Sequence, residues 1–129
     1  DWASHRMEHE LSARFDVAHG AGLAAIWGSW ARYVYREEPE RFAQFAVKVM
    51  GCPNDFRDPE KTALAGIEAM ERYYREIGMP TSVRELGHDL NESEIQLLAG
   101  KCARRNPGLG GFRSLSQDDM IQIFRMARG

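Results

Sequence analysis

Cysteines, long apolar runs and an excess of charge of one sign are all scarce in this sequence. Only two of the 129 residues are cysteines, Cys52 and Cys102, which is too few for a disulfide scaffold. We expect reduced thiols in a cytoplasmic protein, although the sequence leaves a disulfide between the two open. No apolar run approaches the roughly 20 residues of a membrane span, and no secretory signal is visible. The formal net charge is −2, without the basic excess typical of nucleic-acid binding. We therefore expect neither a nucleic-acid nor a membrane partner.

The alternation of apolar and polar residues that indicates β-strands is also almost absent. Apolar residues recur instead at three- and four-residue spacing, which is typical of helices. Residues 18–35 are apolar on nearly all sides, and this pattern predicts a central buried helix. Proline, serine or asparagine residues stand where helices are expected to begin, and glycines where they are expected to end. The sequence predicts one all-α domain over residues 1–129, a bundle of about seven helices over 2–15, 18–35, 39–51, 59–78, 82–87, 92–105 and 117–127.

Three of the four histidines lie close to one another near the beginning of the sequence. They are His5, His9 and His19. Imidazole is the commonest metal ligand in proteins, and a spacing of four places His5 and His9 on one face of a helix. His19 follows a break in the helical pattern, so it can fold back towards that face. The cluster predicts a metal site, although histidine pairs at this spacing also arise by chance.

The residue types around the histidines limit which metal could bind. No cysteine is near, so imidazole with carboxylate ligands would suit Fe(II), Zn(II), Ni(II) or Co(II). The carboxylate could come from Glu8, Glu10 or Asp16, or from outside the chain. His5 to His9 also matches the inverted zinc-peptidase motif His-x-x-Glu-His, in which Glu8 would activate water. That reading needs another carboxylate ligand, for which Glu68, Glu71 and Glu94 are candidates. A non-catalytic helical interaction domain is a third alternative.

Other conspicuous residues have simpler explanations. The tryptophans Trp2, Trp27 and Trp30 are expected in the core rather than in a cofactor site. The glycine-rich segment 108–111 does not follow a strand, so it is interpreted as a hinge and not as a dinucleotide-binding loop.

The histidine segment carries a resemblance to a known family. Residues 1–13, DWASHRMEHELSA, followed by residues 16–24, DVAHGAGLA, resemble the iron-containing (group III) alcohol dehydrogenases, most closely their butanol-dehydrogenase-like branch. Residues 76–86 with the sequence Ile-Gly-Met-Pro, and the tail from Phe112 to Leu115, are similar to that family as well. The resemblance therefore extends over the whole chain.

The resemblance implies a metal-dependent oxidoreductase. Members of the family transfer hydride between a primary alcohol or its aldehyde and NAD or NADP, with a divalent metal as Lewis acid. Fe²⁺ is the metal expected first, and Zn²⁺ second. The family pattern assigns metal binding to His5 and His19, and a catalytic, proton-relaying role to His9.

The resemblance also implies that part of the enzyme is missing from this chain. Family members have an N-terminal nucleotide-binding domain and a C-terminal all-helical domain, with the metal held between them by an aspartate and three histidines. This chain matches the helical domain alone. The nucleotide-binding domain and the other ligands would lie upstream of Asp1, the isolated chain is expected to be inactive, and a homodimer is an additional possibility.

Overall fold

The computed structural model describes residues 1–129 and consists of helices and connecting turns, with no strand. This confirms the predicted all-α fold. The α-helices are α1 (Ala3–Phe15), α2 (His19–Val34), α3 (Pro39–Lys48), α4 (Pro59–Glu76), α5 (Glu92–Arg105) and α6 (Gln117–Ala127), with a short 3₁₀ helix η1 (Tyr35–Glu37) between α2 and α3.

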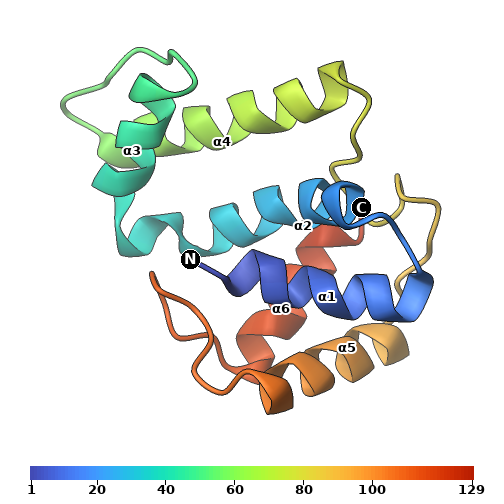
Figure 1. Cartoon of the computed structure of the whole chain (residues 1–129). Coiled ribbons are helices and arrows are strands. Elements are labelled where there is room, and N and C mark those ends of the chain that lie inside the picture. Colours follow the sequence, from blue (N-terminus) through green and yellow to red (C-terminus); the bar gives the residue numbers. More distant parts are fainter.

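Helix α2 is the central element, as its apolar sequence predicts. It packs against α1, α4 and α6, and in Figure 1 it runs between α4 on one side and α1 with α6 on the other. Its small residues allow this close approach on several sides. A Cβ atom on Gly28 would come within 2.2 Å of the Glu71 carboxylate of α4, and Arg32 of α2 pairs with that same carboxylate.

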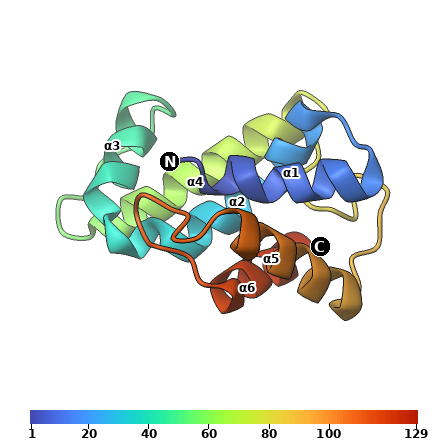
Figure 2. The ribbon, with the colours of Figure 1, turned by 60° about the horizontal axis from the view of Figure 1, so that its bottom comes forward.

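Four of the other helices form two pairs, and α1 lies against α2. Helices α5 and α6 pack against each other and cover α1 and α2, whereas α3 folds back on α4 at the other end of the molecule (Figures 1 and 2). One core of 23 buried residues links α1, α2, α5 and α6 and reaches α3 and α4. The N-terminal half of α1 is therefore held against a continuous packed body.

The serine and asparagine residues at the expected starts of α5 and α6 do cap these helices. Asn91 and Ser116 accept hydrogen bonds from the backbone N–H groups of the third helical residues of α5 and α6, and Asp58 does the same for α4. Pro39 and Pro59 occupy first-turn positions, where the missing N–H costs nothing.

One predicted helix does not form. Residues 81–87 are a series of turns, so the chain has six α-helices and not seven. The Ser82 hydroxyl does accept the N–H of Glu85, but the segment contributes other backbone groups to the end of α6. The N–H groups of Val83 and Arg84 donate to the carbonyls of Ala127 and Arg128, which fastens the segment to the end of α6. Its own backbone hydrogen bonds, from Leu86 to Val83 and from Gly87 to Arg84, have the three-residue spacing of turns.

Both cysteines are free thiols, so the alternative of a disulfide does not apply. Cys102 is buried in the core, and burial raises the pKa of its thiol to about 11. None of the helices combines the length and the hydropathy that a membrane-spanning segment requires.

Candidate metal centre

The three clustered histidines meet at one place on the surface. Rings of His5 and His9, one turn apart on α1, have centroids 4.7 Å apart, and the His19 ring at the start of α2 lies 4.6 Å from that of His5 and 5.4 Å from that of His9. One ring nitrogen from each lies within 4.8 Å of the others. The predicted convergence of His19 on the other two is therefore confirmed.

A tight reversal of the chain brings His19 to this place. Asp16, just after α1, has a left-handed backbone (φ 53°), and its N–H donates to the carbonyl of Ser12. This closes the C-terminal end of α1. Only Val17 and Ala18 then separate Asp16 from the first residue of α2, so α2 returns alongside α1 with His19 facing the histidines of that helix.

The three imidazoles are open to solvent on one side. His9 and His19 are exposed, and His5 is half-buried. Partial burial, followed by the nearby charges of His19 and His9, lowers the pKa of His5. The lowered pKa favours the neutral ring, which is the form that offers a lone pair to a metal.

The glutamate between the first two histidines points away from solvent. Glu8 is 0% exposed and accepts hydrogen bonds from the His19 Nδ1 atom and the Ser12 hydroxyl. Its side chain lies over Gly22 of α2, where a Cβ atom would come within 2.2 Å of the Glu8 carboxylate. Glu8 thus supports His19 from the inner side of the α1–α2 interface.

No carboxylate of this chain joins the histidine cluster. Of the carboxylates considered from the sequence, Glu10 pairs with Arg105 of α5, Glu71 with Arg32, and Glu94 with Arg14. The group is therefore three imidazoles, a donor set that suits borderline divalent metals such as Fe(II) and Zn(II). It fits a metal, and it leaves room for ligands from elsewhere.

An aromatic cavity adjoins His5. It has a volume of about 540 Å³, and its apolar wall consists of Trp2, Leu23, Trp27, Trp30, Tyr74 and Phe112. Trp30 belongs to the buried core and Trp27 packs against it, so the predicted core position is confirmed for Trp30 and in part for Trp27. Trp2 is 65% exposed, which corrects its predicted burial. Leu23 and Trp27, four residues apart on α2, were a sequence signal for this wall, but Tyr74 and Phe112 join it only through the fold.

The glycine-rich segment is tied to the same region. The Asp1 carboxylate accepts the backbone N–H groups of Gly111 and Phe112, and also that of Ala3 at the start of α1. The segment predicted to be a hinge therefore holds the Phe112 ring against Trp30, with ring centroids 6.1 Å apart.

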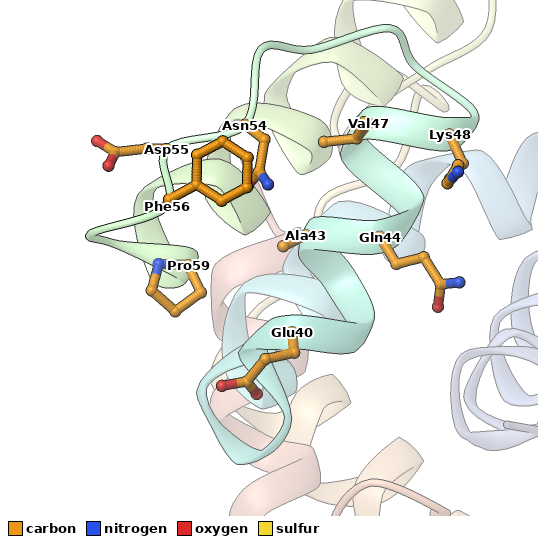
Figure 3. A pocket seen from close by; sticks show the side chains of 9 residues that line it. All are labelled: Glu40, Ala43, Gln44, Val47, Lys48, Asn54, Asp55, Phe56 and Pro59. Atoms are coloured by element: carbon orange, nitrogen blue, oxygen red, sulfur yellow. The ribbon is translucent and has the colours of Figure 1, made fainter.

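A second cavity lies far from the histidines. It has a volume of about 460 Å³ and is formed between α3 and the loop after it, where Phe56 projects over Ala43 and Val47 (Figure 3). It contains no histidine and no cluster of metal-ligating groups. The histidine cluster with its aromatic cavity is the stronger candidate site.

Comparison with known proteins identifies the family of this chain. Residues 1–128 match the family described as the Fe-containing alcohol dehydrogenase family, C-terminal. The chain belongs to the iron-containing alcohol dehydrogenase family. It is 33% identical over 125 residues to a probable NADH-dependent butanol dehydrogenase of Bacillus subtilis, and 30% identical over 126 residues to NADH-dependent butanol dehydrogenase A of Clostridium acetobutylicum.

Solved structures of this family show the same fold. The crystal structure of NADH-dependent butanol dehydrogenase A from Thermotoga maritima matches 100% of this chain with a TM-score of 0.88 and 34% identity, and the chain covers 33% of that protein. A 1,3-propanediol oxidoreductase structure matches 97% of the chain with a TM-score of 0.85 and 28% identity. The sequence matches to the two butanol dehydrogenases cover 97% and 96% of this chain, and each covers 32% of the length of the relative. The chain thus spans about a third of the length of these relatives.

Proposed function

We propose that this chain is the helical, metal-binding part of an NAD(P)-linked alcohol dehydrogenase that interconverts a primary alcohol and its aldehyde. The observation that carries the proposal is the convergence of His5, His9 and His19 beside an apolar cavity, in a chain of this family. Relatives named NADH-dependent butanol dehydrogenases support a nicotinamide cofactor and an alcohol with an apolar chain.

In this proposal His5 and His19 hold a divalent metal, Fe²⁺ in the first place and Zn²⁺ in the second. A bound metal supplies Lewis-acid chemistry by polarising the oxygen of the substrate. His9 is exposed and moves the substrate proton towards solvent, a role suited to an imidazole, which can accept a proton on one ring nitrogen and donate one from the other. The aromatic wall holds the hydrocarbon chain of the substrate and excludes water from it.

The other parts of the site are proposed to come from a nucleotide-binding domain upstream of Asp1. His5 and His19 alone are two ligands, fewer than the three or four protein ligands that such metals usually take. A domain of this kind would supply the missing aspartate, a further histidine and the NAD or NADP site. The threefold greater length of the relatives leaves room for such a domain.

The histidine variants test this assignment in the longer enzyme, by which we mean this chain together with the proposed upstream nucleotide-binding domain. Replacement of His5 or His19 by alanine is expected to abolish stoichiometric metal binding, measured by elemental analysis after dialysis. His9→Ala is expected to retain the metal but to lower kcat by about 10²-fold or more, the usual contribution of a positioned acid–base group. Loss of metal in His9→Ala with retention in His19→Ala would contradict the proposed roles.

The zinc-peptidase alternative is weaker on structural grounds. It requires Glu8 to reach a water molecule on the metal, with zinc on His5 and His9. Glu8 is instead 0% exposed and engaged by Ser12 and His19. Hydrolysis of a casein substrate that disappears in Glu8→Gln would favour the peptidase.

The non-catalytic alternative makes a different prediction. A helical interaction domain with incidental histidines would keep its stability and its binding properties when His5 and His19 are both replaced by alanine, and it would show no metal-dependent gain in melting temperature.

A further inference from the structure

We propose that Glu8 is a positioning residue that fixes the ring orientation of His19 and balances part of the charge of the bound cation. The inference rests on the proposed function, because it requires a metal at His19. It concerns a residue that does not itself belong to the histidine cluster, since its carboxylate lies on the inner side of the α1–α2 interface.

The first argument is the hydrogen bond between the two side chains. The Nδ1 atom of His19 donates to one carboxylate oxygen of Glu8, while the other oxygen accepts the Ser12 hydroxyl. A neutral imidazole with its proton on Nδ1 has its lone pair on Nε2. Glu8 therefore selects the tautomer of His19 that can bind a metal through Nε2, and it also limits rotation of the ring.

The second argument is the charge of the buried glutamate. Glu8 is 0% exposed, and its polar partners in the chain are Ser12 and His19, with no arginine or lysine among them. The other buried glutamate of α1, Glu10, is 2% exposed and forms an ion pair with Arg105 at 2.9 Å. A buried carboxylate is costly without a positive partner. A cation bound at His19 would provide one for Glu8 through the imidazole.

The third argument is the space that α2 leaves for this carboxylate. A Cβ atom on Gly22 would lie 2.2 Å from Glu8 Oε2 and 2.8 Å from its Cγ and Cδ atoms. A glycine at this position therefore lets the carboxylate lie between the helices and reach the His19 ring, while Ser12 holds it from one turn along α1. Glu8, Ser12 and Gly22 together fix the position of the carboxylate beside the His19 ring.

Two substitutions of Glu8 separate its hydrogen bond from its charge. Glu8→Gln retains an acceptor for His19 and a group for Ser12, but it removes the negative charge. Glu8→Leu has a similar size and removes both. We expect the dissociation constant for Zn²⁺, measured by chelator competition in the longer enzyme, to rise about 10-fold in Glu8→Gln and about 100-fold in Glu8→Leu, the range found for residues that orient metal ligands.

The neighbouring glutamate supplies a matched control. Glu10→Gln also removes a buried carboxylate from α1, but Glu10 contacts Arg105 and not a histidine. It should leave the dissociation constant within about twofold of the wild-type value, whatever it does to stability. The visible spectrum of the Co²⁺-substituted enzyme, which reports ligand geometry, should change in both Glu8 variants and remain unchanged in Glu10→Gln.

The outcomes distinguish this inference from the proposed function. If the wild-type enzyme binds metal, loses it in His19→Ala and keeps an unaltered affinity and cobalt spectrum in both Glu8 variants, the positioning role is wrong and the metal site stands. Equal losses of affinity in Glu8→Gln and Glu10→Gln would also overturn it, because they would indicate a general effect of a destabilised helix. If the wild-type enzyme binds no metal at these histidines, both proposals fail.

Discussion

At the residue scale, the two glycines in the first turn of α2 have different surroundings. A Cβ atom on Gly22 would lie 2.2 Å from the Glu8 carboxylate, which is too close for two non-bonded atoms. A Cβ atom on Gly20 would have the flexible end of Met79 as its nearest neighbour, at 3.9 Å. Replacement by alanine should therefore destabilise the fold at Gly22 but not at Gly20.

We expect Gly22→Ala to lower the free energy of unfolding by about 1–3 kcal/mol, the usual cost of overpacking an interior. It should also weaken metal binding, since Glu8 must move away from His19. Urea unfolding and chelator competition measure the two effects. Gly20→Ala is the control and should be neutral or slightly stabilising, because alanine is the better helix former. Equal stability of the two variants would contradict the close approach of Glu8 to Gly22.

At the element scale, α6 begins with a cap that also links it to other parts of the fold. Asp119 and Ser116 form a reciprocal capping box, and Asp119 also accepts the Tyr33 hydroxyl of α2 and pairs with Arg113. Burial opposes the charged form of Asp119, but the hydrogen bonds from Tyr33 and Ser116 and the charge of Arg113 together lower the pKa of its carboxyl. The charged form is therefore the one that stabilises the fold.

This pKa shift predicts how stability depends on pH. Because the folded-state pKa is lowered, the contribution of Asp119 is fully present above the usual aspartate pKa of about 4 and is lost as the pH falls through the lower folded-state value. Asp119→Asn should cost about 1–3 kcal/mol at pH 7, and the difference from wild type should shrink below about pH 4. Urea unfolding at a series of pH values measures it.

The adjacent aspartate is the control for this prediction. Asp118 is exposed in the same turn and is not a partner in the cap. Its replacement by asparagine should cost less than about 1 kcal/mol, the size of a helix-dipole effect. A cost in Asp119→Asn that stays constant down to pH 3 would argue against a lowered pKa.

At the scale of the whole molecule, the hydrophobic core is complete within this chain, whereas the proposed metal site is not. The 23-residue core joins helices from both ends of the chain and is built from this chain alone. The metal site, in contrast, has only imidazole ligands here. The chain produced by itself should therefore fold but lack dehydrogenase activity.

We expect the 129-residue chain to fold as a helical domain, to bind Zn²⁺ at least 10-fold more weakly than the longer enzyme, and to show no oxidation of butanol with NAD. Circular dichroism, chelator competition and absorbance of NADH measure the three properties. The same assays on the longer enzyme are the control. Turnover of alcohol by the isolated chain would contradict the proposal that an upstream domain completes the site.

Individual residues show how far the sequence could predict the site. The shared face of His5 and His9 follows from helical geometry alone, and the break before His19 made its return plausible. The inward direction of Glu8 did not follow, because a glutamate between two histidines on a helix has the same spacing whether it faces solvent or a neighbouring helix. Its burial depends on Gly22, which belongs to another element.

The division between sequence and tertiary structure has a common physical basis. Helical periodicity, caps and the clustered histidines are local properties, so the all-α fold, most helix boundaries and the candidate ligands could be derived from residues near one another. The turns at 81–87, the partner of each glutamate and the aromatic wall with Tyr74 and Phe112 depend on segments brought together by burial of the core. Only packing decides which polar group on a helix is left in water and which is enclosed with a partner.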